Sequence, residues 1–186
     1  MIGMSDSLMY VTVMPQDKAI LRKPSKDVPQ SALDSPELKT LLAKMLKTVQ
    51  DPSQDGVGIA APQVGINRRI VLVQRFDKAD EPFECYVNVR VDSLYGDLKS
   101  GPEGCLSVPP FRGIVPRYTK ADISYASLPD GRRLHETVEG YTAIIFQHEC
   151  DHLDGILYTD RADSVFVSLS WAKERAGYSY PRPEWW

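Results

Sequence analysis

Cysteine and histidine are both scarce in this chain. Each occurs three times in 186 residues. An odd number of cysteines leaves one thiol over after any pairing, which argues against a secreted disulfide framework and favours a reducing compartment. The chain also lacks an apolar run of about 20 residues, the length that a transmembrane helix needs. We therefore expect neither a disulfide scaffold nor a membrane partner.

Basic charge is not in excess either. The chain has 22 Lys and Arg residues against 25 Asp and Glu residues, a formal net charge of −3. The chain has no overall basic field that would attract nucleic acid, so sequence-specific nucleic-acid binding is not expected.

The first 14 residues contain no Lys or Arg and include Asp6, unlike a secretory signal or an arginine-rich transit peptide. We expect a cytoplasmic location. The alternative is the matrix of a mitochondrion or plastid, reached by a mature form that has lost its transit peptide.

The length of the chain suits one domain with a sizeable core. We expect a single domain over residues 1–186, with a loose N-terminal segment at 1–17 and a Pro- and Trp-rich tail at 172–186. Strand-like runs bracketed by two helix-like runs indicate an α+β fold rather than alternating βαβ units.

Local patterns position these elements. Ser35 and Pro36 mark a helix start, because a small polar cap precedes proline at the first helical position. An apolar stripe with the helical period follows: Leu38, Leu41, Leu42, Met45, Leu46 and Val49.

β-Branched and aromatic content predicts strands at 69–74 and 84–91, and a hairpin with arms at 120–128 and 132–138. The glycines and proline of residues 56–63 indicate a loop. A second helix is expected over 141–153, with Gly155 as its stop.

The second predicted helix carries two of the three histidines. His148 and His152 are four residues apart, so both imidazoles lie on one face and can reach one ion. Glu149 is offset from that line, where it can reach a water without being a ligand itself. The alternative is a chance spacing of two histidines. Because histidine is so scarce here, we favour a metal with a general base beside it.

A hydrolytic metal site needs a third protein ligand and an open position for water. Cys105, in a glycine-flanked extended segment, would complete the set with a thiolate, although a free cysteine is more commonly a small buried apolar residue. Acids downstream of the helix are the alternative ligands: Asp160, Asp163 and Glu174. The other candidates are not expected to bind metal: Cys85 and Cys150 as buried small residues, and His135 as an exposed hairpin residue.

Three segments together resemble the signature motifs of the peptide deformylase family. They are GVGIAAPQ at 56–63, EGCLS at 103–107 and QHECDH at 147–152. The histidine motif alone is shared with many proteases, but all three in this order are specific. The resemblance extends over about residues 18–171. Ile59 stands where the family commonly has leucine, which is a volume-conserving departure.

The resemblance implies an enzyme that removes the formyl group from the N-terminal formyl-methionine of newly made polypeptides. It implies an α+β fold, with a mixed or antiparallel sheet around a central metal-binding helix. It also implies one divalent metal ion, usually Fe²⁺, with Zn²⁺, Ni²⁺ or Co²⁺ as alternatives. The implied partners are formyl-methionyl nascent chains and the ribosome, in a cytoplasm of the bacterial type.

The resemblance also implies a role for individual residues. Cys105, His148 and His152 are the metal ligands, and Glu149 is the general base. The Gln63 amide and the Leu106 backbone N–H are the oxyanion donors, and the Gly58 backbone pairs with the substrate. A methionine pocket is implied around four side chains, unless these serve only as core: Val57, Tyr141, Ile144 and Ile145.

Two other functions fit part of this pattern. A zinc endopeptidase would use the same helix, with a downstream acidic ligand and no role for Cys105. An inactive family member would serve as a binding module on ribosomes or nascent chains. Such a module would have no chemical need for an intact Gln63, Cys105, Glu149 and histidine pair, so we favour the enzyme.

Overall fold

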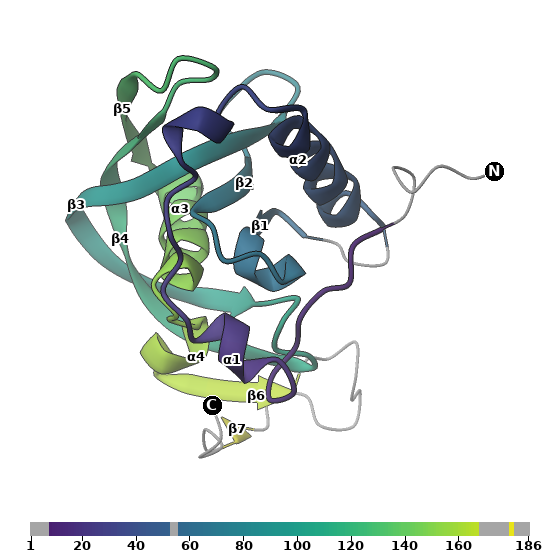
Figure 1. Cartoon of the computed structure of the whole chain (residues 1–186). Helices are drawn as coiled ribbons and strands as arrows, with labels where there is room; N and C mark the ends of the chain where they lie inside the picture. The colour runs from purple at the N-terminus through teal and green to yellow at the C-terminus, as the bar shows by residue number, and fades with distance from the viewer. Residues whose placement is uncertain (1–7, 53–55, 168–178, 181–186) are drawn as a thin grey trace.

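The computed structural model describes residues 8–52, 56–167 and 179–180, and its strands form one sheet (Figure 1). The strand order is β1-β2-β3-β4-β6-β7, and β5 pairs with β4 outside that path. The strands are β1 Gly58–Ala60, β2 Ile70–Gln74, β3 Phe83–Gly104, β4 Phe111–Ala126, β5 Arg133–Glu139, β6 Ser164–Val167 and β7 Ser179–Tyr180. The helices are α1 Lys18–Leu21, η2 Gln30–Ala32, α2 Pro36–Val49, η3 Ala61–Val64, α3 Gly140–Leu153 and α4 Tyr158–Arg161. The paired strands run antiparallel, and the α+β prediction is confirmed.

Helix α3 lies against the sheet and contacts β1 to β5 (Figure 1). Ala143, Phe146 and Leu153 are fully buried, so the helix is held by apolar packing on several sides. The prediction of a helix over 141–153 is confirmed to within one residue. Gly155 follows with φ at +75°, a conformation that favours glycine at a helix end. The chain therefore leaves α3 where the sequence indicated.

Helix α2 also begins and ends close to its predicted bounds. The Ser35 hydroxyl oxygen accepts a hydrogen bond from the Leu38 backbone N–H at 3.2 Å, which caps the helix. Leu38, Met45 and Val49 of the predicted stripe are buried against the sheet core. Amphipathic burial and the cap together account for this helix.

Strands β3 and β4 are far longer than the sequence predicts. The sequence predicts a strand over 84–91, whereas β3 extends from Phe83 to Gly104. Residues 92–100 are exposed, so they show no alternation of buried and polar side chains that would reveal a strand. They are extended because they pair with β4, for example Leu98 with Tyr118, across three register shifts. The long pairing brings Gly104, at the end of β3, beside the start of β4.

The prediction of a loop over 56–63 is wrong in detail. Residues 58–60 form β1, the terminal strand of the sheet, and a short 3₁₀ helix, η3, follows directly. The three residues of β1 are too few to show a strand period, and the sheet partner β2 supplies their hydrogen bonds. The predicted 120–138 hairpin is confirmed, with Ala126 of β4 paired to Arg133 of β5.

The N-terminal segment is held against the rest of the protein over residues 9–17, where the sequence leads us to expect a loose chain over 1–17. The Thr12 backbone N–H donates to Gln63 O at 2.7 Å, and the Met14 backbone N–H donates to Ser107 O at 2.9 Å.

Residues 1–7 lie outside the described residues, as does the expected tail at 172–186 apart from β7. The single-domain assignment stays a prediction. Within the described ranges, no helix has the length and apolar character needed to cross a membrane.

Candidate metal centre and active site

The end of β3 and two turns of α3 bring three metal-ligating side chains together. The sulfur of Cys105 and one ring nitrogen each of His148 and His152 lie within 4.8 Å of one another. Cys105 Sγ is 3.3 Å from His152 Nε2. A thiolate and two imidazoles suit a divalent transition ion with tetrahedral preference and leave one position open. In the part of the chain that the structure describes, this is the one group of three such donors.

The imidazole of His148 is oriented by a carboxylate on β3. His148 Nδ1 lies 2.8 Å from Glu103 Oε1, so Nε2 is the atom left to face the centre. Arg117 of β4 contacts both oxygens of Glu103 at 3.0 Å and also donates to Asp151 at 2.7 Å. Burial alone would raise the pKa of Glu103, but hydrogen bonds from His148 and Arg117 lower it to about 2. Glu103 therefore stays ionised and holds the ring in place.

His152 is the more deeply buried of the two histidines, at 1% exposure. Its Nδ1 atom has no hydrogen-bond partner among the described residues. Burial, and next the charge of the neighbouring His148, lower the pKa of His152 well below its usual range. The ring is therefore neutral, which is the form that binds a metal.

Glu149 is a buried carboxylate beside the three ligands. It is 3% exposed, and its Oε1 has no hydrogen-bond partner in the described ranges. Burial raises its pKa from 4.5 to about 7. A carboxylate with a pKa near neutrality can both accept and return a proton at physiological pH.

Gly58 on β1 leaves the space in which Glu149 lies. A Cβ added at Gly58 would fall 2.5 Å from Glu149 Oε2 and 2.9 Å from Glu149 Cγ. Such contacts are shorter than van der Waals distance, so a side chain at this position would displace the carboxylate. Glu149 is therefore the neighbour that requires a glycine at this position.

The side-chain amide of Gln63 is fixed at both ends. Its Oε1 accepts from the Ala60 backbone N–H at 2.9 Å, and its Nε2 lies 3.4 Å from Cys105 Sγ and 3.2 Å from Ser107 Oγ. The donor end of the amide therefore points at the ligand cluster. Leu106 lies between Cys105 and Ser107, and its backbone N–H has no acceptor within the described ranges. The Gln63 amide and the Leu106 backbone N–H thus both lie next to Cys105.

A cavity of about 160 Å³ opens next to Glu149 and His148. It is lined by the five residues proposed from the sequence to contact substrate: Val57, Gly58, Tyr141, Ile144 and Ile145. Ile144 is half-buried, whereas Ile145 is 3% exposed and belongs to the main core. Ile145 therefore serves as both core and cavity wall, which is why sequence reasoning could not choose between the two.

Sequence reasoning missed part of this cavity wall. Pro102 and Arg112 also line it, because the β3–β4 register sets Gly104 opposite Arg112. The ring of Phe76 stacks on the wall residue Tyr141, at 5.5 Å between centroids. No local pattern marks these positions, since each depends on a pairing between distant segments.

The remaining candidates lie away from the centre. Asp160 is paired with Arg22, Asp163 is exposed, and Glu174 lies outside the described residues. His135 is on β5 with a 72% exposed side chain. Cys150 is buried as expected, whereas Cys85 is exposed, contrary to expectation, because it faces outward on β3. None of the described downstream acids joins the histidines.

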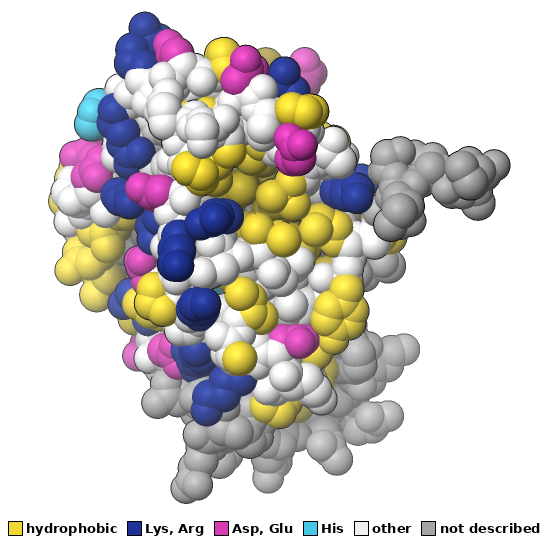
Figure 2. All heavy atoms as spheres, in the orientation of Figure 1, with side chains coloured by type: hydrophobic (Ala, Val, Ile, Leu, Met, Phe, Trp, Pro, Cys, Tyr) yellow, Lys and Arg dark blue, Asp and Glu magenta, His cyan; other side chains and the backbone are white. Residues whose placement is uncertain are grey.

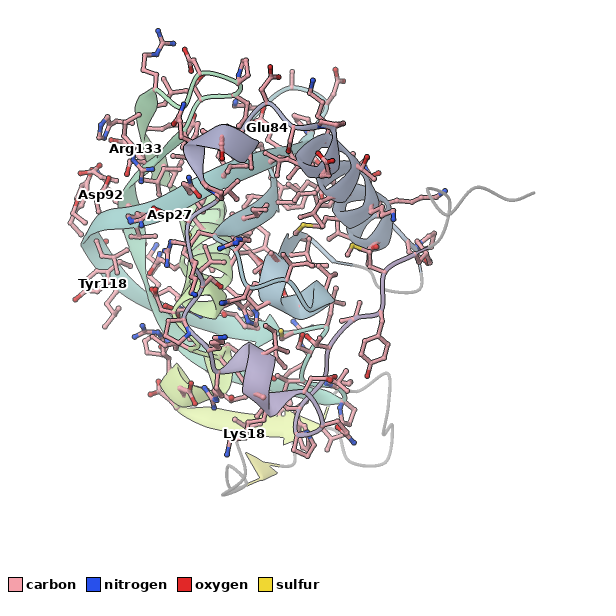
Figure 3. All side chains as sticks on the ribbon, in the orientation of Figure 1. Lys18, Asp27, Glu84, Asp92, Tyr118 and Arg133 are labelled. Carbon is pink, nitrogen blue, oxygen red and sulfur yellow. The ribbon has the colours of Figure 1, made fainter. Side chains whose placement is uncertain are left out.

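A larger cavity of about 750 Å³ lies on the other side of α3. Figure 3 shows Tyr118, one of its lining residues, on the flank where β3 and β4 bend. Ion pairs line it, including Arg69 with Asp154 at 2.9 Å, and neither Glu149 nor a ligand histidine does. Its size alone therefore does not make it the reactive site.

Known proteins match most of this chain. The family model described as polypeptide deformylase matches residues 10–166. A peptide deformylase of Leptospira biflexa is 38% identical over 153 residues, which cover 78% of this chain and 84% of that protein. A Met-Ala-Ser-bound class I type b peptide deformylase from Acinetobacter baumannii has a TM-score of 0.74 at 34% identity, covering 83% of this chain and 98% of that one. A peptide deformylase from Synechococcus elongatus in complex with actinonin has a TM-score of 0.73 at 33% identity, covering 83% and 80%. The matched residues 10–166 include the three motifs and the ligand cluster.

Proposed function

This chain belongs to the polypeptide deformylase family, and on that premise we propose a role for each residue of its site. The chain is a hydrolase that removes the N-formyl group from newly made polypeptides. The family is metal-dependent, and the Cys/His cluster is where an ion would bind. One observation carries the assignment of roles: a buried carboxylate with a raised pKa, Glu149, adjoins both the ligand cluster and the cavity.

We propose that Cys105, His148 and His152 hold one divalent ion. Fe²⁺ is our choice for the native metal, and Zn²⁺, Ni²⁺ and Co²⁺ are the alternatives, because a mixed thiolate and imidazole set binds all four. When bound, the ion supplies positive charge that polarises the formyl carbonyl and makes water more acidic. Glu103 and Arg117 keep the His148 ring aimed at it.

Glu149 acts as the general base and then the general acid. Its carboxylate takes a proton from the attacking water and later gives a proton to the departing amine. The close packing of Glu149 against Gly58 restricts the position of this carboxylate. The Gln63 amide and the Leu106 N–H donate to the oxyanion that forms on the formyl oxygen. The two prearranged donors do not need to reorient during the reaction.

The substrate main chain pairs with β1. This strand is the terminal strand of the sheet, paired on one side with β2, so an extended peptide could pair with its other edge at Gly58, whereas the Ala60 N–H is already bonded to Gln63 Oε1. Gly58 would supply backbone hydrogen bonds there. The methionine side chain enters the cavity between Val57, Tyr141, Ile144 and Ile145. A related enzyme with Met-Ala-Ser bound supports this kind of ligand.

We further propose that the enzyme acts in the cytoplasm, at the ribosome. Figure 2 shows Lys and Arg side chains gathered along the face that carries the N-terminal segment. Lys18, Lys23 and Lys26 of that segment are exposed, and Lys26 adjoins Arg68 through a backbone bridge. Such a band complements RNA phosphates without reading their sequence. Its local charge contrasts with the net charge of −3.

The deciding assay compares four substrates on one metal-loaded preparation made without oxygen. Formyl-Met peptides should react well, acetyl-Met peptides poorly, formyl-Ala peptides more slowly than formyl-Met, and an unfolded protein should not be cut internally. Internal cleavage would favour a zinc endopeptidase instead. Full metal content without any turnover would favour an inactive binding module.

A further inference from the structure

The N-terminal segment crosses both loops that carry the proposed oxyanion donors. We call residues 10–14 the strap. Thr12 N–H donates to Gln63 O at 2.7 Å, and Met14 N–H donates to Ser107 O at 2.9 Å. Figure 1 shows this part of the chain descending on the right of the molecule before it reaches α1. The strap therefore joins two loops that are 44 residues apart in sequence.

Thr12 makes a second bond to the same loop. Its hydroxyl donates to Pro62 O at 2.9 Å, so one residue satisfies two successive carbonyls of η3, those of Pro62 and Gln63. Thr12 is 4% exposed, and water therefore cannot readily replace either bond. The Pro62 carbonyl also accepts from the Gly65 N–H at 3.1 Å within η3, so the Thr12 hydroxyl is the bond that ties this carbonyl to the strap, and its loss would loosen η3 from the strap.

Hydrogen bonds also hold the chain just before the strap and at its end. Met9 N–H donates to the Thr48 hydroxyl on α2 at 3.0 Å, and Val13 N–H donates to the Asp17 carboxylate at 2.8 Å. The residue before the strap is thus tied to α2, and Val13 is held by the turn that leads into α1. Gln63 belongs to η3, so a shift of the η3 backbone would strain the bonds that hold its amide to Ala60 and Ser107.

We propose that Thr12 is a positioning residue for deformylation, acting through Gln63. Its hydroxyl fixes the η3 backbone so that the Gln63 amide meets the oxyanion in the transition state. The inference rests on the proposed oxyanion role of Gln63. It assigns a kinetic function to a residue that touches neither substrate nor ligand cluster, and whose hydroxyl has no counterpart in the three motifs.

A double-mutant cycle tests this coupling. Thr12→Val keeps the size of the side chain and removes the hydroxyl. It should lower kcat on a formyl-Met peptide about two- to tenfold, the range for one net hydrogen bond, with KM and bound metal unchanged. Thr12→Ser should restore kcat, and Thr40→Val, at an exposed position of α2, should not change it. In a Gln63→Ala background, Thr12→Val should cause no further loss.

The outcomes separate this inference from the proposed function. Wild-type protein that fails to deformylate would overturn the proposed function. Normal wild-type activity with an undiminished Thr12→Val effect in the Gln63→Ala background would overturn only the positioning role. The same holds if Thr12→Val lowers the melting temperature but leaves kcat of the folded, metal-loaded enzyme intact. Should the valine variant not fold, Thr12→Ala supports the same cycle.

Discussion

Nδ1 of His148 lies 2.8 Å from Oε1 of Glu103, and the carboxylate of Glu103 is in turn held by Arg117. A histidine and a glutamate from different elements, α3 and β3, are thus locked into one orientation. Because the glutamate holds Nδ1, Nε2 is the ring atom available as a ligand. With His148 as a ligand, this pairing would make the metal affinity depend on Glu103, a residue that is not itself in the ligand set.

Replacing that carboxylate should weaken metal binding. Glu103→Ala should lower affinity roughly 10- to 100-fold, the usual effect of removing a partner behind a ligand histidine. Titration against a competing chelator measures the affinity, and the melting temperature shows whether the loss of a buried partner for Arg117 has unfolded the protein. Glu37→Ala, an exposed acid on α2, is the control. Unchanged affinity in folded Glu103→Ala would remove this residue from the metal site.

The ligand set itself should respond to single substitutions. Cys105→Ala, His148→Ala and His152→Ala each remove one of three donors and should each reduce the bound metal measured by elemental analysis. His135→Ala should retain it, because that side chain is 72% exposed on β5. A Cys105→Ala protein with full metal and full rate would show that the three-ligand set is wrong.

Substitution of the general base, Glu149, should reduce kcat without reducing metal binding. Glu149→Gln keeps the shape of the side chain but cannot accept a proton. It should bind metal almost normally and lose about 10²- to 10⁴-fold in kcat, the usual contribution of general acid–base catalysis. Parallel metal analysis and steady-state kinetics check both parts. Near-normal turnover with full metal would assign the base to another group.

The space at Gly58 should be needed for catalysis. Gly58→Ala places a Cβ 2.5 Å from the Glu149 carboxylate, so it should lower kcat at least about tenfold by moving the base, since small misplacements are costly in catalysis. Gly101→Ala is the matched control, because a Cβ there meets nothing within 4 Å. Equal activity of the two variants would mean that Glu149 does not need this space.

The methionine pocket should respond to narrowing at its partly exposed wall. Ile144→Trp is preferable to a change at Ile145, which is 3% exposed and part of the core. It should reduce kcat/KM for formyl-Met peptides more than for formyl-Ala peptides. In the unchanged protein, the alanine substrate should be weaker by at most roughly a hundredfold, or ~2–3 kcal/mol of lost apolar burial. Equal rates for both substrates would reject the pocket while leaving the chemistry intact.

Sequence patterns predict the elements of the fold and of the site whose signal lies in neighbouring residues. The α3 helix, its end at Gly155, and the turn spacing of His148 and His152 follow from a helical period and one glycine. Cys105 was recognised because its neighbours form a motif. In each case the signal lies within about a dozen consecutive residues, where side-chain period and backbone preference suffice.

Features that depend on distant pairing could not be predicted. The exposed half of β3 is extended because β4 lies beside it, and Arg112 reaches the cavity through the same register. The bonds from Thr12 to η3 join chain segments about 50 residues apart. A threonine in a weakly patterned N-terminal segment carries no local sign of that contact.

The ligand cluster joins positions of the chain that are far apart: Cys105 and His152 are separated by 47 residues. In a denatured chain these groups would move independently. A cross-link between them would lower the conformational entropy of the denatured chain, and this entropy loss grows slowly with loop length. An ion shared by the three side chains would join the end of β3 to α3 in this way. Because such an ion binds the folded chain far better than the unfolded one, it favours folding by mass action. Metal supply would then affect how much of this protein is folded as well as how fast it works.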